Sequence, residues 1–343
     1  MGVRKDRDKA PSIDDVARLA GVSSQTVSRV ARSSGQVREA TRAKVQRAMD
    51  QLGYSPNHAA RALRSGSLKL IGVLTQQIER TGESFTTSGV LEAARDLGYA
   101  AIVSQVTHPE ADEVHDALTR LAQQPIDALV IVQSGTATYR HLGLPAGLPV
   151  ASSDSALVGY YPSASADQVQ GVRDAVGHLL DLGHRNVHHV NGPADSQSAA
   201  IRAAAWHRRL EEAGIRAPEP VPGGWGPDDG YRAGLQLAED PEVTAVFCAN
   251  DEVALGLIRA LHEKGRRVPE DISVVGFDGL PVSEYSFPPL TTIRQDFHRA
   301  GRTMIDLIAE QLDGGPRDGS RHVVIPTELV IRASTAPPIR SGR

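Results

Sequence analysis

Residues 12–30 read Ser-Ile-Asp-Asp-Val-Ala-Arg-Leu-Ala-Gly-Val-Ser-Ser-Gln-Thr-Val-Ser-Arg-Val, and this stretch decides the fold of the N-terminal part of the chain. Ser12 and Asp15, three residues apart, form the pattern of a capping box at the start of a helix. Gly21 ends that helix, and Ser23 caps a second one. The apolar residues expected to face inward are Val16, Leu19 and Ala20 on the first helix and Val27 and Val30 on the second. Two short helices joined by a glycine-containing turn predict a helix-turn-helix.

The outward face of the second helix is polar and carries no acidic residue. Its members are Ser24, Gln25, Ser28 and Arg29. A glutamine side chain can form two hydrogen bonds with adenine, and an arginine two with guanine. A solvated helix in an ordinary helical bundle would show the same pattern, so this face by itself is only a moderate indication of DNA binding.

The charge of the chain is unevenly distributed. Residues 1–66 contain 13 Lys and Arg against 6 Asp and Glu, a net charge of +7, whereas the remainder contains 24 against 35, a net charge of −11. A compact basic region on an acidic body is the pattern expected of a nucleic-acid-binding protein. Because the positive charge coincides with the predicted helix-turn-helix, it favours DNA binding over mere solvation.

The length of 343 residues predicts two or three domains. No stretch is long and apolar enough for a membrane span, and no apolar segment follows the charged N-terminus. We therefore expect neither membrane insertion nor a secretory signal. The single cysteine, Cys248, lies in an apolar run, which predicts a buried structural thiol in a reducing cytoplasm.

A third helix is predicted over residues 38–52 and ends at Gly53. Its inward residues, at helical spacing, are Val45, Ala48, Met49 and Leu52. This helix would close a three-helix head. Residues 57–66 have high helix propensity but little apolar surface, and a helix this short is marginal in water, so by themselves they predict a linker.

From Lys69 onward, short apolar runs alternate with longer amphipathic stretches, several of which end at a glycine. The expected strands are 70–74, 100–104, 128–132, 150–152, 187–190, 245–249 and 272–276. The expected helices are 89–97, 168–182, 196–213 and 252–263. This alternation predicts parallel β-α-β units. Roughly 270 residues are too many for one doubly wound sheet, so we expect two α/β lobes.

Two blocks of sequence carry a resemblance to a known family. The first is Asp14-Asp15-Val16-Ala17, Ala20-Gly21-Val22-Ser23 and Thr26-Val27-Ser28-Arg29-Val30, and the second is Tyr54-Ser55-Pro56-Asn57 with Ala60-Arg61-Ala62-Leu63. With this spacing the chain resembles the lactose-repressor (LacI/GalR) family of bacterial regulators. The resemblance continues through residues 249–256, 271–278 and 288–297. It implies a body like a periplasmic sugar-binding protein, in which the chain crosses more than once between two lobes that close on a ligand.

For the N-terminal part, the resemblance implies a hinge helix over residues 57–66 that orders only on operator DNA. Leu63 matches the position that wedges between base steps in the minor groove. Because a helix-turn-helix head reads one half-site, we expect a homodimer on a near-palindromic operator. The residues expected to contact DNA are Ser12, Ser23, Ser24, Gln25, Thr26, Ser28, Arg29, Asn57, Ala60 and Leu63.

Polar side chains follow several predicted strands, at the edge of the sheet where open α/β folds bind ligands. Asp154, Asn250 and Asp278 have this position, and Asp251 is expected to cap the helix that follows it. Carboxylates accept bonds from sugar hydroxyls, arginine donates a planar fork, and an aromatic ring stacks beneath the sugar. By resemblance, the positions that contact galactosides are Asp154, Arg202, Trp225, Asn250, Asp278 and Gln295.

The loop of residues 76–84 is polar and charged where the resemblance leads to a largely apolar segment. The part of the effector on that side of the cleft is therefore expected to differ. A sugar or sugar-like polyol is the broader expectation, and a galactoside the narrower one.

An enzyme is not expected. Two carboxylates in a cleft would suit a glycosidase, but the sequence carries no glycosidase motif. His188, His189 and His207 lack metal-ligand spacing, and we predict neither a metal nor a cofactor. Two other functions stay open. One is a co-repressor-dependent regulator of the same family that binds a nucleobase, and the other is a sugar receptor without DNA binding, against which the basic head and the missing signal both argue.

The predicted organisation is a disordered arm over residues 1–11, a DNA-binding head over 12–56, a hinge helix over 57–66, a two-lobed ligand-binding and dimerisation domain over 67–335, and a disordered tail over 336–343. The tail contains prolines and no heptads, so a dimer is expected rather than a tetramer. We expect a cytoplasmic, nucleoid-associated repressor. By resemblance, a bound sugar lowers its affinity for the operator.

Overall fold

The computed structural model describes residues 11–31, 37–54, 67–106, 111–133, 142–153 and 155–339. The chain divides into two compact units, Met1–Leu68 and Lys69–Arg343. The predicted hinge helix, with Asn57, Ala60 and Leu63, lies outside the described residues, as do Asp154 and almost all of the predicted N-terminal arm. Among the helices that are described, none is long and apolar enough to cross a membrane.

The first unit is a three-helix head formed by α1 (Ile13–Ala20), α2 (Ser24–Ala31) and α3 (Glu39–Leu52). The predicted capping box is present: the Asp15 amide donates to Ser12 Oγ, and the Ser12 amide donates to Asp15 Oδ2 at 2.9 Å. Gly21 and Gly53 end α1 and α3 with φ near +62°, a conformation that glycine adopts without steric cost. The local signals in the sequence therefore set the boundaries of α1 and the end of α3.

The core of the head is made mostly of alanine and valine side chains. Its buried members are Val16, Ala17, Ala20, Val27, Val30, Val45, Ala48 and Met49. The prediction for Leu19 was wrong, since this side chain is 44% exposed and Ala17 is buried in its place. At about 100° per residue, the buried face of α1 is centred between Val16 and Ala17, and Leu19 points well away from it.

We expect the capping box to contribute about 1 kcal/mol to the stability of α1. Ser12→Ala removes the acceptor for the Asp15 amide and should lower the free energy of opening of α1, measured by amide hydrogen exchange in the full chain, by about that amount. Gln51→Ala, which truncates an exposed and uncharged polar side chain on α3, is the control. Equal effects of the two variants would show that the cap contributes nothing.

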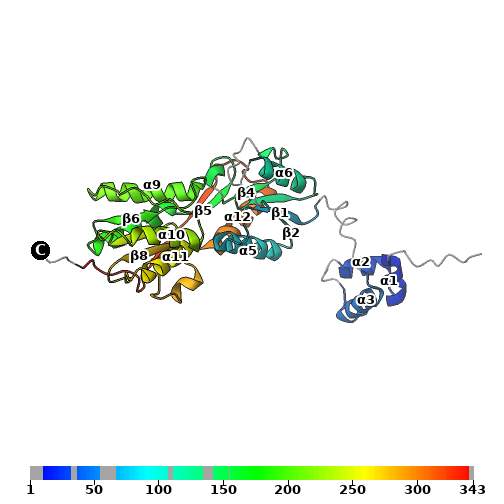
Figure 1. The fold of residues 1–343 in the computed structure, drawn as a ribbon. Helices are drawn as coiled ribbons and strands as arrows, with labels where there is room; N and C mark the ends of the chain where they lie inside the picture. Colours follow the sequence, from blue (N-terminus) through cyan, green and yellow to red (C-terminus); the bar gives the residue numbers. More distant parts are fainter. Residues whose placement is uncertain are drawn as a thin grey trace, which may run out of the picture. The chain divides into compact units, whose positions relative to one another are not determined.

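The second unit contains two sheets, one in each lobe, in which all strands but β11 run parallel to their neighbours (Figure 1). The N-lobe sheet has the order β10-β5-β4-β3-β1-β2, and all of its pairings are parallel. Its strands are β1 (Leu70–Thr75), β2 (Ala100–Gln105), β3 (Ala128–Ile131), β4 (Val150–Ser152), β5 (Ser163–Ala166) and β10 (His322–Ile325). The helices of this lobe are α5 (Thr81–Asp96), α6 (Ala111–Ala122) and α12 (Phe297–Leu312), with a short 3-10 helix, η1 (Ser155–Leu157).

The C-lobe sheet has the order β11-β9-β8-β7-β6, with only β11 antiparallel to its neighbour. Its strands are β6 (Val187–Val190), β7 (Ala245–Cys248), β8 (Ser273–Asp278), β9 (Thr291–Arg294) and β11 (Glu328–Val330). Its helices are α8 (Gln168–Asp181), α9 (Gln197–Glu212), α10 (Pro227–Leu237) and α11 (Asp251–Glu263), with a 3-10 turn, η2 (Pro281–Glu284). The predicted class, two α/β lobes with parallel sheets behind an all-α head, is confirmed.

Each apolar run predicted as a strand is one, with ends shifted by two residues at most. Four further strands, β5, β9, β10 and β11, were missed because they carry few apolar residues or lie half-exposed at a sheet edge. Helix α5 begins at Thr81, eight residues before the predicted start. Its polar first half packs against α12, where Gly89 and Gly301 permit close approach: a Cβ at Gly89 would lie 2.5 Å from the His298 carbonyl oxygen.

Within the described residues the chain passes between the lobes at three places. These are the short connections from β5 to α8, from β9 to α12 and from β10 to β11. The first two connections place Gln168 and Gln295 at the boundary between the lobes. Residue 336, where the predicted tail begins, is still bound to the C-lobe, since its amide donates to Ser273 Oγ and its carbonyl oxygen accepts from His184.

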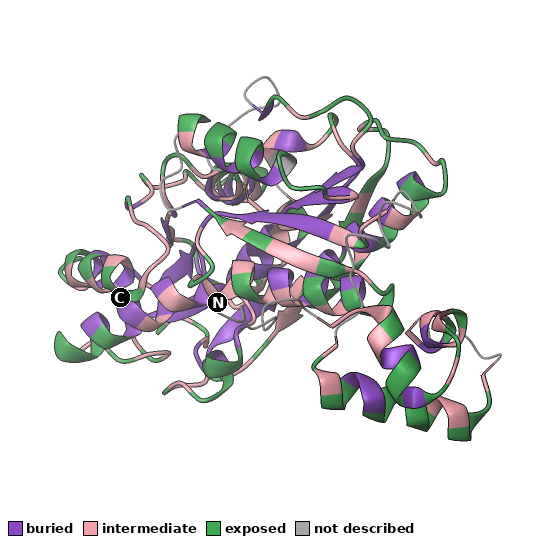
Figure 2. Ribbon diagram, turned by 90° about the vertical axis from the view of Figure 1, so that its right-hand side faces the viewer, coloured by how far each residue is buried: buried purple, intermediate pink, exposed green. Residues whose placement is uncertain are grey.

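The buried residues follow the strands and the inner faces of the helices (Figure 2). In the C-lobe, Trp206 and Phe247 are the largest fully buried side chains near α8 and α9, and Trp206 Nε1 donates to the Val187 carbonyl oxygen. Cys248 is completely buried, as predicted, and burial raises the pKa of its thiol. Each lobe thus has its own core, so the lobes can move against each other as units.

Candidate functional site

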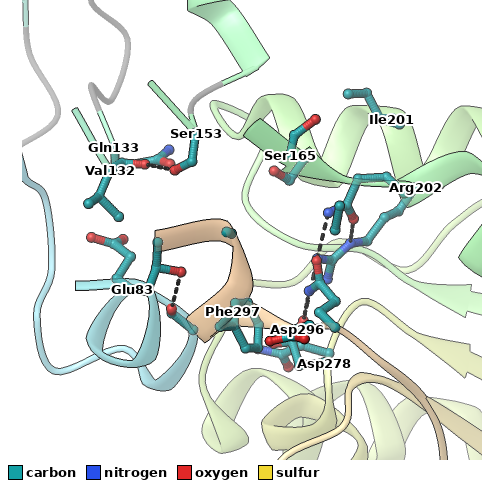
Figure 3. Close-up of a pocket in the computed structure, with 18 of the residues that line it drawn as sticks. Glu83, Val132, Gln133, Ser153, Ser165, Ile201, Arg202, Asp278, Asp296 and Phe297 are labelled. Atoms are coloured by element: carbon teal, nitrogen blue, oxygen red, sulfur yellow. Dashed lines mark hydrogen bonds and ion pairs between the residues drawn. The ribbon is translucent and has the colours of Figure 1, made fainter. Parts of the chain in front are cut away.

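Five of the six predicted ligand residues line one cavity of about 350 Å³ between the lobes (Figure 3). They are Arg202, Trp225, Asn250, Asp278 and Gln295. Three of them follow parallel C-lobe strands: Asn250 comes after β7, Asp278 ends β8 and Gln295 comes after β9. Their convergence follows from the sheet, because the carboxyl ends of parallel strands meet at one edge.

Four side chains in this cavity form a closed ring of hydrogen bonds. Arg202 Nε donates to Gln168 Oε1 at 2.8 Å, and Gln168 Nε2 donates to Gln295 Oε1 at 2.9 Å. Gln295 Nε2 donates to Asp278 Oδ1 at 2.6 Å, and Arg202 Nη2 lies 3.4 Å from the same oxygen. The ring fixes the orientation of each polar group before any ligand enters.

Arg202 is 4% exposed, and its guanidinium lies over the Phe277 ring, 3.9 Å from the ring centroid. Burial lowers its pKa from the ordinary value, while Asp278 opposes that change. Its Nη1 donates to the Ala249 carbonyl oxygen. Bonds to described residues therefore occupy three of its five N–H groups, and two are left for a ligand in the cavity.

Asp278 stands at the end of β8 with φ of +112°, a conformation that is uncommon for a residue other than glycine. Burial raises the pKa of its carboxyl group to about 7, against the opposing effect of Arg202. Both bonds from described side chains go to Oδ1, so Oδ2 keeps its capacity to accept further hydrogen bonds. A carboxylate held in this way accepts hydroxyl groups strongly.

The prediction that Asp251 caps α11 was wrong. Asn250 is the cap, with its Oδ1 accepting from the Val253 amide at 2.8 Å, and its Nδ2 donates to the Trp225 carbonyl oxygen at 3.0 Å. Asp251 is fully buried and accepts from the Leu280 amide and from the hydroxyls of Ser283 and Thr292. Burial raises its pKa to about 6, and these bonds hold the turn that follows Asp278.

The opposite wall of the cavity belongs to the N-lobe and is also polar. Figure 3 shows Glu83, Gln133 and Ser153 on this side, with Phe297 between them and Asp278. Glu83 Oε2 accepts from Thr75 Oγ1 and from the amides of Gln76 and Gln77 at 2.8–3.0 Å, and burial raises the pKa of the carboxyl group. In the sequence, the polar and charged loop of residues 76–84 was the feature that pointed to a polar wall on this side of the cavity.

Among the residues that line the cavity, a hydrogen bond joins the two lobes. Thr81 Oγ1, at the start of α5, donates to Glu252 Oε1 in the first turn of α11 at 2.7 Å. Both residues line the cavity. In the part of the chain that the structure describes, no group of three His, Cys, Asp or Glu side chains is arranged to hold a metal.

The predicted DNA-contacting residues of the head lie on and around α2. Gln25 and Arg29 are exposed, whereas Ser12 belongs to the capping box and Ser23 Oγ lies 2.9 Å from Thr26 Oγ1. Ser24 Oγ donates to Asp14 Oδ1 at 2.6 Å. The structure thus presents Gln25 and Arg29 to the solvent, and it ties Ser24 to a neighbour on α1 that sequence reasoning missed.

Comparison with known proteins decides the family. Residues 12–57 match the family model described as bacterial regulatory proteins, lacI family, and residues 176–335 match a periplasmic binding protein-like domain. The chain is 34% identical over 336 residues to the lactose operon repressor of Escherichia coli K12, with 96% of this chain and 92% of the relative covered. The chain belongs to the LacI family of bacterial regulatory proteins.

Further relatives and solved structures are similar to this chain over most of their length. The HTH-type transcriptional repressor PurR of Vibrio atlanticus is 34% identical, covering 88% of this chain and 92% of the relative. The solved lac repressor dimer bound to operator and the anti-inducer ONPF matches with a TM-score of 0.84 at 33% identity, covering 96% of this chain and all of that one. A complex of the regulator CelR with cellobiose matches with a TM-score of 0.71 at 29% identity, covering 94% and 99%.

These matches confirm the predicted family and the prediction that the chain is a regulator and not an enzyme, since the relatives are repressors. Gln168 is the member of the ring that sequence reasoning missed. Gln168 begins a predicted helix, but its place beside Gln295 depends on strand β5, which comes directly before it. That strand was not predicted, because its sequence Ser-Ala-Ser-Ala has no run of large apolar residues.

Gln168→Ala tests the ring in this LacI-family protein. The change leaves Arg202 Nε and Gln295 Oε1 without a partner from α8, and we expect the free energy of unfolding to fall by about 1–3 kcal/mol. Gln170→Ala, an exposed position on the same helix, is the matched control in urea unfolding. A loss no larger than that of the control would show that the ring does not stabilise the lobe boundary.

Proposed function

We propose that the protein is a transcriptional repressor that binds a near-palindromic operator as a dimer and is released by a small sugar in the cleft between its lobes. The observation that carries this proposal is the ring of Arg202, Gln168, Gln295 and Asp278, four hydrogen-bonded side chains that line one cavity at the lobe boundary and keep unused donor and acceptor capacity. In this proposal the three-helix head binds the operator, and the repressor acts in the cytoplasm.

A sugar matches the chemistry of this cavity. Adjacent hydroxyl groups can donate to Asp278 Oδ2 while their oxygens accept from the two remaining N–H groups of Arg202. Trp225 and Phe297 offer apolar ring surface for the C–H face of a sugar. The volume of about 350 Å³ is in the range of small-molecule sites. The relative CelR, solved with cellobiose, supports a sugar as effector.

The polar N-lobe wall restricts the kinds of sugar that would fit the cavity. Glu83 and Gln133 face the cavity from the side opposite Asp278, so both ends of the cavity present hydrogen-bonding groups. An effector with hydroxyl groups at both ends, such as a disaccharide, satisfies both walls. A galactoside is one such sugar, and the related lac repressor supports it.

A nucleobase acting as co-repressor is the second candidate. Relatives named PurR are as similar in identity as the lactose operon repressor. A planar base would stack on Trp225 and form hydrogen bonds along its edge with Asp278 and Arg202. The four hydrogen-bonded side chains are therefore compatible with a nucleobase as well as with a sugar. The second polar wall beyond Phe297 favours the sugar, because a single flat base spans less of the cavity.

The effector and the operator are coupled through the orientation of the lobes. A ligand that bonds to both walls stabilises one orientation, and operator-bound heads stabilise another, so each lowers the affinity for the other. For the dimer, a second copy would cover an apolar surface on the C-lobe formed by Val282, Tyr285 and Phe287. These side chains are 50%, 82% and 95% exposed in the single chain.

Thermal unfolding against a panel of mono- and disaccharides and purines tests the effector. A ligand that binds only the folded state raises the melting temperature. We expect a shift with one or more sugars that is lost in Arg202→Ala and retained in Arg208→Ala, an exposed arginine on the same helix. The active sugar should also weaken operator binding. A shift with purines alone would replace the sugar by a nucleobase.

Binding of the active sugar should also depend on pH. Since the pKa of Asp278 is about 7, its carboxyl group is mostly protonated below that value and then loses acceptor capacity. We expect affinity to fall roughly tenfold from pH 8 to pH 6, measured by titration calorimetry. Asp278→Asn should bind weakly at both pH values and without this slope. An unchanged slope in that variant would assign the pH dependence to another group.

A further inference from the structure

The folded head places a carboxylate beside the start of the recognition helix. Asp14, in the first turn of α1, is exposed, and its Oδ1 accepts the Ser24 hydroxyl at 2.6 Å. Ser24 is the first residue of α2. In helix-turn-helix proteins the N-terminal residues of the second helix contact base edges in the major groove. The outward face of α2 has no acid of its own, but α1 supplies one at this end.

The bond between these two residues fixes which kind of group this end of the helix presents. A serine hydroxyl has one hydrogen to donate, and Asp14 takes it, so Ser24 is left with acceptor lone pairs only. An ionised aspartate is also an acceptor only. Arg29, farther along α2, is a donor only, and Gln25 is both. The face of α2 expected to contact bases therefore has hydrogen-bond acceptors at its start, from Asp14 and Ser24, and a donor farther along, from Arg29.

The major groove distinguishes these two ends. Cytosine presents the N4 amino group as a donor there and adenine presents N6, whereas guanine N7 and O6 and thymine O4 are acceptors that a carboxylate repels. We propose that Asp14 and Ser24 together form a specificity-determining pair that selects cytosine, with adenine second, at the base facing the start of α2. This inference rests on the proposed operator binding.

The alternative role for Asp14 is a purely local one, since a carboxylate in the first turn stabilises a helix through its dipole. Asp15 already supplies a carboxylate at that terminus through the capping box. A negative charge on a surface that faces DNA also weakens binding to every sequence, because the phosphates repel it. Residues 1–66 nevertheless carry a net charge of +7, and a base donor bound to Asp14 would offset the repulsion between its carboxylate and the phosphates.

Selection of binding sites from a randomised operator library, with full-length protein, tests the pair. The base facing the start of α2 is the one at which Ser24→Ala changes the selected sequence. We expect the wild type to select cytosine there, with adenine second, and Asp14→Asn to reduce that preference roughly fivefold or more. Asp14→Asn should also bind unrelated DNA more tightly at low salt, because a repulsive charge is removed.

Asp50→Asn removes the same charge from α3 and is the matched control, expected to leave base preference unchanged. Selection of guanine or thymine at that base by the wild type would overturn the proposal, as would a preference that survives in Asp14→Asn. No change in Ser24→Ala would overturn it too. If the wild type selects no sequence at all, it is operator binding itself that fails. Thermal unfolding of each variant separates a lost preference from a lost fold.

Discussion

The C-lobe half of the cleft depends on one buried arginine. Arg202 is surrounded by partners that come from three separate parts of the chain: Gln168 from the first crossing between lobes, Asp278 from the end of β8, and the backbone of Ala249 after β7. A buried guanidinium without partners would cost several kcal/mol, so each segment must come into place for the others to be stable. The same contacts that satisfy Arg202 shape the cavity.

A second buried carboxylate supports this arrangement from behind. Asp251 bonds to the Leu280 amide, Ser283 and Thr292 and so holds the turn that follows Asp278, where φ is +112°. Tight packing around glycine adds to the constraint, since a Cβ at Gly276 would meet Asp251 Oδ1 at 2.2 Å. The strained conformation at the end of β8 is thus maintained by polar contacts among residues that do not line the cavity.

Local signals in the sequence predicted the head and the apolar strands, because capping boxes, glycine stops and buried runs act over a few residues. They correctly predicted Ser12 as the N-cap and Gly21 as the C-cap of α1, and Val187–Val190 as a strand. They failed where tertiary context decides: Leu19 is exposed, Asn250 caps in place of Asp251, and Ser163–Ala166 is a strand without an apolar run. Gln168 and Asp14 acquire their partners only when distant segments meet, so no spacing rule could have found those contacts.

Strand β1 runs from the point where the chain enters the N-lobe to the wall of the cavity. Its carboxyl end, Thr75, is bonded to Glu83 in the cavity wall, and its other end, Leu70, is where the chain arrives from the N-terminal unit. Six buried or half-buried residues in an extended strand form a rod about 17–20 Å long that cannot shorten. A tilt of the N-lobe against the C-lobe therefore displaces Leu70 as the far arm of a lever. Under the proposed function, a ligand that tilts the N-lobe would therefore move the residue at which the chain enters this lobe.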